Sequence, residues 1–230
     1  MSLLAIDKEL NALKNKTYAE HAQRFFKTAK GEYGEGDCFL GIRVPALRKL
    51  AKQYKNIDLS AVQKLLDSKW HEKRLMALFI LIHQYKNSPD QVYKMYINNF
   101  KNINNWDLVD TSCHKIIGPY LFEKDRSILY KWSKSKDLWT KRISMMSTYY
   151  FIQRKQFEDA LNLAEILLND KHDLIHKVVG WMLREIGNKS KATEDTFLKK
   201  HYKVMPRTML RYAIEKYPQT ERKKILNSLW

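Results

Sequence analysis

Four similar segments recur along the chain at nearly constant spacing, and this internal repeat constrains the fold more than any other feature. The segments surround Trp70, Trp106, Trp139 and Ile175, which are separated by 36, 33 and 36 residues. Each segment follows a short polar turn and opens a long apolar stretch. Repeats of this length with two helices per unit are typical of α-solenoids, in which the units stack along one direction.

Apolar residues between these points recur at the helical period. In residues 47–54 and again in residues 160–168 they are spaced by three and four positions. Longer stretches with the alternating pattern of strands are missing, and the chain has only seven glycines and five prolines. The sequence therefore predicts an all-α fold, an α-solenoid of HEAT-like helical repeats that forms a single domain over residues 1–230. A non-repetitive helical bundle is the alternative.

The charge of the chain favours an anionic partner. Lysine and arginine number 42 against 25 acidic residues, which gives a net charge of +17, whereas a magnitude of about 2–8 is enough to keep a small domain soluble. Nucleic acid is the commonest partner of so basic a protein. An apolar content of 44% excludes a disordered chain. The longest apolar run has eight residues (75–82), far fewer than the roughly 20 that span a membrane, so no membrane partner is expected.

The cysteines indicate a reducing compartment. Cys38 and Cys113 are too few for a disulfide framework, and the sequence has no CxxC or HExxH motif. We therefore expect no metal site and no cofactor. The N-terminal residues lack the basic region and the long apolar stretch of a signal peptide. We expect a monomer that lies in the cytoplasm, associated with the nucleoid through its nucleic-acid partner.

Cations stand directly after three of the four repeat markers. They are Lys73, Arg74, Lys141, Arg142, His176 and Lys177. Because stacked units place equivalent positions in a row, these side chains predict a concave basic face that follows a phosphate backbone. Ordinary solvated charges beside each helix are the alternative. The second marked segment departs from the rule, since Asp110 stands where the others carry Arg74 and Arg142.

The segment with Asp110 also carries a tryptophan at helical spacing. Trp106 and Asp110 lie about one turn apart on the same flank of the predicted helix. The free N–H groups and the dipole at a helix start favour an ionised carboxylate. An acid in the first turn is also typical of ordinary helix starts, here with Asn104 or Asn105 as the cap, and taken alone this segment favours that interpretation.

Two residues of later segments lie off the apolar stripe of their helices. Trp181 lies about 120° from Ile175 on the helical wheel. It either packs against the neighbouring repeat or lies in a binding cleft. Arg142 lies about 60° from the apolar stripe of its own helix. The repeats thus offer one acid, two indoles and several cations at comparable positions.

These residues carry a resemblance to a known family. The motifs WDLVD (106–110), WTKR (139–142) and GWMLRE (180–185), preceded by FLGIRVP (39–45), resemble the AlkD-type bacterial DNA alkylation-repair glycosylases. The resemblance extends over most of the chain. Members of that family are solenoids of HEAT-like repeats that excise N3- or N7-alkylated purines from double-stranded DNA.

The resemblance implies a role for each marked residue. Asp110 matches the catalytic carboxylate, Trp106 and Trp181 match the paired indoles against the deoxyribose, and Arg142 matches a phosphate-binding arginine. An alkylated purine is already cationic and leaves readily, so the enzyme has to stabilise the positive charge that develops on the sugar, by a carboxylate and by indole faces. The further phosphate-binding residues would be Lys73, Arg74, Lys141 and Lys177. The resemblance also implies that the lesion stays stacked, without a deep base-flipping pocket.

One stretch departs from the family pattern. GEYGEGD, from Gly31 to Asp37, is either a flexible connector or a DNA-contacting loop. Its acids Glu32, Glu35 and Asp37 argue against contact with phosphates, whereas Tyr33 could reach a groove or the lesion.

Three functions remain open on the sequence. The first is the glycosylase. The second is a non-catalytic DNA-binding HEAT-repeat protein that recognises damaged or branched DNA. The third is a HEAT scaffold that binds an acidic protein. A protein-binding scaffold would have no role for a single acid in a row of cations, which argues against the third function. Some branches of the resembled family keep the fold without the activity, so the second function stays open.

Overall fold

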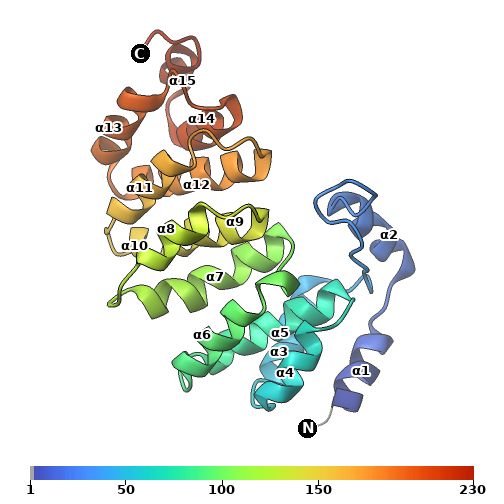
Figure 1. Ribbon diagram of the computed structural model, residues 1–230. Coiled ribbons are helices and arrows are strands. Elements are labelled where there is room, and N and C mark those ends of the chain that lie inside the picture. Colours follow the sequence, from blue (N-terminus) through green and yellow to red (C-terminus); the bar gives the residue numbers. More distant parts are fainter. Residues whose placement is uncertain (1–2) are drawn as a thin grey trace. The chain divides into compact units, whose positions relative to one another are not determined.

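The computed structural model describes residues 3–230, which form helices joined by mostly short connections and by one long connection between α2 and α3 (Figure 1). In chain order the helices are α1 (Leu3–Ala12), α2 (Lys16–Phe25), α3 (Val44–Gln53), α4 (Leu59–Leu66), α5 (His71–Gln84), α6 (Pro89–Asn98), η1 (Phe100–Asn102), α7 (Trp106–Leu121), α8 (Ser127–Ser133), α9 (Leu138–Ser147), α10 (Tyr149–Ile152), α11 (Glu158–Ile166), α12 (Asp173–Lys189), α13 (Lys191–His201), α14 (Arg207–Ala213), η2 (Ile214–Lys216) and α15 (Gln219–Leu226). The described residues form no strand, and Cys38 and Trp70 make one isolated bridge. The predicted all-α fold is confirmed.

Each repeat marker stands at the start of a helix. Trp70 directly precedes α5, Trp106 is the first residue of α7, Trp139 is the second of α9, and Ile175 is the third of α12. Shorter helices lie between these four in the chain: α6, then α8, then α10 with α11. The markers therefore recur at the same structural position, as expected for helical repeats. The concave basic face stays a prediction.

The chain divides into two compact units, Met1–Ser112 and Cys113–Trp230, and α7 runs from the first into the second. The single domain expected from the sequence stays a prediction. Among residues 3–230, no helix combines the length and the apolar character needed to cross a membrane.

Helix α5 is the core of unit 1. It packs against α3, α4 and α6, and every side chain of residues 74–81 is buried. An apolar run this long, without a polar face, is stable only where neighbours cover it on all sides. The buried part of α5 also includes the polar residues His71 and Glu72 at its start. Their burial requires partners, and these partners define the candidate site.

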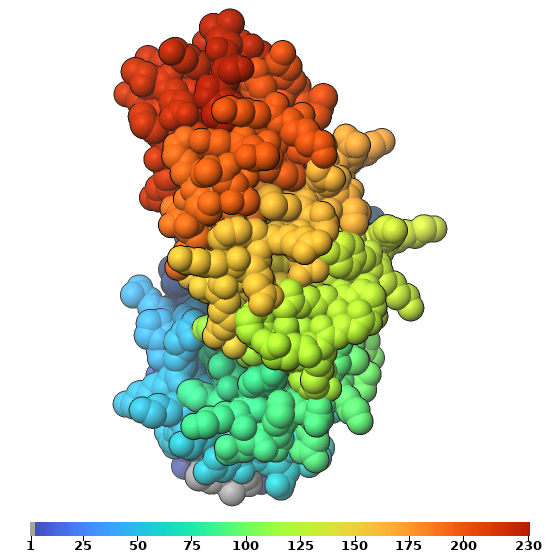
Figure 2. All heavy atoms as spheres, turned by 90° about the vertical axis from the view of Figure 1, so that its left-hand side faces the viewer, coloured from blue at the N-terminus to red at the C-terminus, as the bar shows by residue number. Residues whose placement is uncertain are grey.

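Helix α12 has the same central place in unit 2. It packs against α9, α11, α13 and α14. Its closest neighbour is α14, because a Cβ at Gly180 would lie only 2.4 Å from the carbonyl oxygen of Met209. Glycine therefore lets the two backbones approach. On the face drawn in Figure 2, the colours of unit 2 follow the chain order, as expected when successive helices stack on one another.

Candidate functional site

The WDLVD motif forms the beginning of α7. The side-chain oxygen of Asn105 accepts a hydrogen bond from the backbone N–H of Trp106 at 2.8 Å. Asp110 follows one turn after Trp106 and is partly exposed. The expected placement of Trp106 and Asp110 on one flank of a helix is therefore present. Both residues belong to unit 1.

The other acid of the motif, Asp107, has a structural partner. Its carboxylate is buried and lies 2.8 Å from Nε2 of His71, the first residue of α5. The opposite ring nitrogen, Nδ1, lies 2.9 Å from the carboxylate of Asp37. One imidazole thus joins the end of the glycine-rich segment to the first turn of α7.

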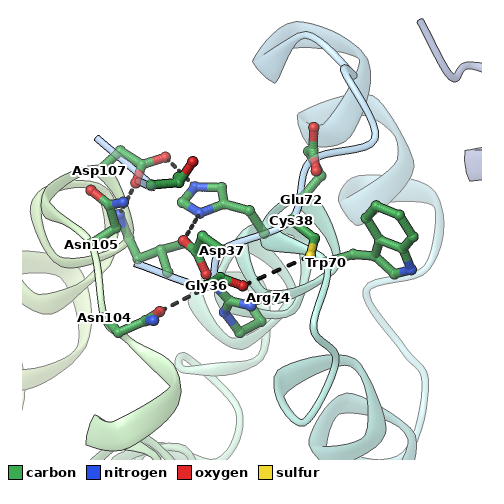
Figure 3. Close-up of polar contacts among 12 residues, drawn as sticks. Gly36, Asp37, Cys38, Trp70, Glu72, Arg74, Asn104, Asn105 and Asp107 are labelled. Atoms are coloured by element: carbon green, nitrogen blue, oxygen red, sulfur yellow. Dashed lines mark hydrogen bonds and ion pairs between the residues drawn. The ribbon is translucent and has the colours of Figure 1, made fainter. Parts of the chain in front are cut away.

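Arg74 completes this network. Its guanidinium forms an ion pair with Asp37 and donates to the carbonyl oxygen of Ser68 at 2.9 Å and to the side chain of Asn104 at 3.1 Å. Asp37, Arg74, Asn104 and Asp107 converge from the glycine-rich segment, α5 and the start of α7 (Figure 3). Only 4% of Arg74 is exposed. Because its charge is balanced inside the protein by Asp37, Arg74 is not a proposed DNA contact.

The network is ionised at neutral pH. Burial by itself lowers the pKa of His71, but the charge and hydrogen bond of Asp107, with those of Asp37, outweigh burial and raise the pKa to about 9. Burial by itself raises the pKa of Asp37, but the hydrogen bond from His71 and the charge of Arg74 outweigh burial, so the pKa of Asp37 is lowered. His71 is therefore an imidazolium whose two N–H groups donate to two carboxylates.

Glu72, the next residue of α5, holds the FLGIRVP motif. Its buried carboxylate accepts the backbone N–H groups of Leu40 and Gly41, each at 2.8 Å, and of Ile42 at 3.2 Å. Gly41 has φ +78°, and a Cβ on it would lie 2.0 Å from the carbonyl oxygen of Asn15. The motif is thus fixed between α5 and the residue before α2.

The acids of the glycine-rich segment are structural. Glu32 accepts the backbone N–H of Ala29 at 2.9 Å, and Glu35 accepts that of Gly31 at 2.7 Å. Together with Asp37 in the network above, each acid of this segment bonds inside the protein. The segment consists of turns held by these bonds, which explains why it is acidic in a basic chain.

An aromatic pocket of about 400 Å³ lies beside this network, entirely within unit 1. Its walls come from α2, the FLGIRVP motif, and the starts of α3, α5 and α7. The ring of Trp106 stacks on Phe26 at 5.3 Å between centroids and meets Phe25 edge-on at 5.8 Å. Phe39 stacks on His71 at 4.6 Å. The shallow groove that the family resemblance implies stays a prediction.

Each cation predicted to bind phosphate has an acceptor within its own unit. The pairs are Lys73 with Asp7, Arg74 with Asp37, Lys141 with Asp170, Lys177 with Asp173, and Arg142 with the carbonyl oxygen of Leu174. Ion pairs of partly exposed lysines contribute only about 0–1 kcal/mol. The lysines can therefore exchange their carboxylate for a phosphate, while Arg142 is buried.

Trp181 lies on α12 in unit 2 and is partly exposed. Its indole N–H donates to Glu185 at 3.0 Å, and its ring lies 6.4 Å from that of Tyr149. In unit 2, α9, which carries Lys141 and Arg142, packs against α12, which carries Lys177. The helical wheel predicts that Trp181 lies off the apolar stripe of its helix, and its side chain is partly exposed in the structure, as that position requires.

The network residues Asp37, His71, Glu72 and Asp107 were missed by the sequence reasoning. A signal was present: the polar sequence HEKR opens the longest apolar run of the chain, so its side chains are buried and need partners. The partners themselves lie 30 or more residues away in the chain and leave no local pattern. Among residues 3–230, no group of three or more His, Cys, Asp or Glu side chains could hold a metal ion.

A family model described as DNA alkylation repair enzyme matches residues 6–217. No curated protein matches the chain.

Among solved structures, one described as a predicted DNA alkylation repair enzyme from Enterococcus faecalis has a TM-score of 0.74 at 14% identity, covering 90% of this chain and 97% of that chain. AlkD2 from Streptococcus mutans has a TM-score of 0.54 at 19% identity, covering 89% of this chain and 99% of that chain. At such identities the likeness shows the fold alone.

Proposed function

The chain belongs to the family of DNA alkylation repair enzymes, and on this premise we propose that it is a DNA glycosylase that excises N3- or N7-alkylated purines from double-stranded DNA. The observation that supports this most is the pairing of an acid with an indole, Asp110 one turn after Trp106, in a helix that the family match includes.

The proposed chemistry depends on the charge of the substrate. Alkylation at N3 or N7 makes the purine a cation, so the base leaves without protonation by a general acid. Positive charge then develops on the deoxyribose as the glycosidic bond breaks. Asp110 is proposed to stabilise that charge as a carboxylate and to orient the attacking water.

The indole of Trp106 is proposed to contact the sugar, and a role for Trp181 rests on the family resemblance alone. An indole face attracts a cation, and the attraction increases where water is excluded. Phe25 and Phe26 hold the ring of Trp106 in unit 1, and Glu185 holds that of Trp181 in unit 2. Fixed rings lose little rotational freedom when substrate binds, which favours catalysis by positioning.

Binding to the DNA backbone is assigned to the partly exposed Lys73, Lys141 and Lys177, because Arg142 is buried in the same way as Arg74. Each lysine is proposed to exchange a carboxylate of the protein for a phosphate of the DNA. These contacts set position without reading sequence, so binding is expected to depend on salt and little on base sequence.

Release of free base from alkylated DNA tests the activity. The wild-type protein is incubated with duplex DNA that carries N7-methylguanine, and free methylated base is quantified by chromatography. Asp110→Asn is expected to abolish release while DNA affinity stays within about twofold. Asp137→Asn is the matched control, because Asp137 is an exposed acid before α9 whose side chain accepts the N–H of Thr140, and asparagine caps helices equally well.

The outcomes separate the functions considered. If the wild-type protein binds DNA but never releases base, it is a non-catalytic DNA-binding protein and not a glycosylase. If it binds neither alkylated nor plain duplex, a scaffold for an acidic protein replaces both.

A further inference from the structure

Two buried cations of α5 attach the beginning of α7, the helix that carries the proposed catalytic pair. Nε2 of His71 donates to the carboxylate of Asp107 at 2.8 Å, and the guanidinium of Arg74 donates to the side chain of Asn104 at 3.1 Å (Figure 3). Only 2% of His71 and 4% of Arg74 is exposed. Trp106 therefore stands between two residues that are held from the same neighbouring helix.

Every oxygen of Asp107 has a hydrogen-bond donor. Oδ2 accepts the bond from α5, Oδ1 accepts the backbone N–H of Leu108 at 2.9 Å, and the carbonyl oxygen accepts the hydroxyl of Thr111 at 2.7 Å. Asp107 is the residue after Trp106 and lies three residues before Asp110. Because one turn of a helix moves as a unit, the bond that fixes Asp107 also fixes the backbone of both proposed catalytic residues.

Ring contacts give a second connection between His71 and Trp106. The ring of Phe26 lies 5.1 Å from that of His71 and stacks on that of Trp106 at 5.3 Å between centroids. Phe39 stacks on His71 at 4.6 Å and on Phe26 at 5.1 Å. An imidazolium attracts aromatic faces. The orientation of the indole therefore depends on His71 through the ring of Phe26 as well as through the backbone of α7.

Stability alone is a poor explanation for this network. The five charged side chains Asp37, His71, Glu72, Arg74 and Asp107 are all buried, and their removal from water carries a high desolvation cost. Well-packed apolar residues would often join two helices as strongly or more strongly. Hydrogen bonds between ionised groups, in contrast, fix both distance and direction. The network therefore suits a part of the molecule that has to keep one geometry.

We propose that His71 and Arg74 are positioning residues, which fix the start of α7 so that Trp106 and Asp110 meet the sugar in one geometry while neither cation touches the DNA. This inference rests on the proposed function. A displacement of about 1 Å at a reacting group can slow a reaction about 100-fold. Loss of the network should therefore slow cleavage of the glycosidic bond, whereas DNA affinity should stay, because the lysines assigned to phosphate are not part of the network.

Two variants release α7 from one anchor each. Asp107→Asn removes the charge that faces His71 and keeps a side chain of the same shape, and Asn104→Ala removes the acceptor of Arg74 on the α7 side. Single-turnover release of N7-methylguanine from duplex DNA is expected to slow at least about tenfold in Asp107→Asn and at least about threefold in Asn104→Ala. The dissociation constant for the same duplex, from fluorescence anisotropy, is expected to stay within about twofold.

Arg126→Gln in unit 2 is the control. Arg126 forms an ion pair with Asp159 at 2.7 Å and donates to the carbonyl oxygen of Leu121 at 3.3 Å, so its loss lowers stability without releasing the start of α7. It is expected to leave the excision rate unchanged at a temperature where circular dichroism shows every variant to be folded. An unchanged rate in Asp107→Asn, an equal slowing in Arg126→Gln, or a fall in DNA affinity as large as the fall in rate would each overturn the proposal.

A fluorine signal tests the geometry without any activity. The chain has six tryptophans, and 5-fluorotryptophan labelling gives each of them a fluorine resonance, with that of Trp106 identified by its loss in Trp106→Phe. One narrow resonance is expected for Trp106 in wild type and in Arg126→Gln. In Asp107→Asn it is expected to broaden or split, because the indole then adopts more than one orientation. A Trp106 resonance that is the same in Asp107→Asn as in wild type would overturn the proposal.

The proposed function and the positioning role fail in different ways. If the wild-type protein releases no base, the glycosylase proposal fails, and the fluorine resonance of Trp106 still tests whether the network fixes the indole. If the wild-type protein releases base and Asp107→Asn releases it at the same rate, the positioning role fails alone.

Discussion

Nε2 of His71 lies 2.8 Å from the carboxylate of Asp107, and this interaction ties the start of α5 to the first turn of α7. The same imidazole bonds Asp37 through Nδ1. Asp107 is the residue next to Trp106, so the position of the indole beside the pocket depends on a buried ionised histidine. The candidate site of unit 1 is therefore built on an internal ion network rather than on an apolar core.

Removal of the imidazolium is expected to destabilise the protein strongly. In His71→Gln, the buried carboxylates Asp37 and Asp107 lose the cation between them, which typically costs about 3–5 kcal/mol. Urea denaturation gives the free energy of unfolding. Lys73→Gln is the control, because it removes the partly exposed ion pair with Asp7 and is expected to cost about 0–1 kcal/mol. Similar losses in both variants would contradict the ion network.

The same histidine makes stability depend on pH. Its pKa is about 9 in the folded protein and about 6.5 in the unfolded chain. The stabilisation is fully present below about pH 6.5 and is lost as pH rises through about 9, because the folded state binds the proton more tightly over this range. Unfolding free energies measured across this range should decline more in wild type than in His71→Gln.

Glu194 in α13 predicts a second pH dependence, in unit 2. Burial raises its pKa to about 8, and its Oε1 has no hydrogen-bond partner among the described residues. Because the folded state keeps this carboxyl protonated, its contribution to stability is greatest below about pH 4.5 and falls by about 1.4 kcal/mol per pH unit up to about pH 8.

Glu194→Gln is expected to abolish that decline, since an amide resembles the protonated acid and does not titrate. The measurement is the free energy of unfolding at several pH values between 5 and 8, compared with wild type. Asp195→Asn alters the neighbouring acid, whose pKa is lowered, and is the control. An unchanged slope in Glu194→Gln would contradict the prediction.

Glycine at position 41 is required by both conformation and space. Its φ is +78°, and a Cβ would overlap the backbone at Asn15. Gly41→Ala is expected to cost at least about 3 kcal/mol in unfolding free energy, from backbone strain and from displacement of α2. Gly36→Ala shares a positive φ of +83° but has nothing within 4 Å of the added Cβ. Gly36→Ala therefore tests backbone strain without steric overlap, and it is expected to lower the free energy of unfolding by about 1–2 kcal/mol.

Phosphate binding by the lysines of unit 2 predicts a change in salt dependence. Lys177→Gln is expected to weaken binding to all DNA sequences alike and to reduce the slope of log affinity against log salt by about 0.9, because the variant neutralises one phosphate fewer. Lys200→Gln is the control, because Lys200 is an exposed lysine with a carboxylate partner, Glu165, and is no part of the proposed DNA-binding set. Equal changes in both variants would show that only the net charge matters.

The predictable part of the site is the part that lies within one helix. Trp106 and Asp110 share a flank because 3.6 residues make a turn, and this geometry holds wherever the helix is placed. The cations after the repeat markers were found in the same way, but their ion pairs were not. Lys141 meets Asp170, and Arg74 meets Asp37, at separations of 29 and 37 residues.

The sequence by itself determined the all-α fold, the repeat markers at helix starts and the family, because helical periodicity and short motifs are local properties that survive in the linear order of residues. Only the tertiary structure decided that His71, Glu72 and Arg74 are buried partners of distant groups and that aromatic residues from α2, α5 and α7 enclose a pocket. Burial and ion pairing depend on which surfaces meet, and removal of water from those surfaces makes an unpaired charge too costly to keep. Such pairings have no fixed spacing along the chain, so no local sequence pattern predicts them.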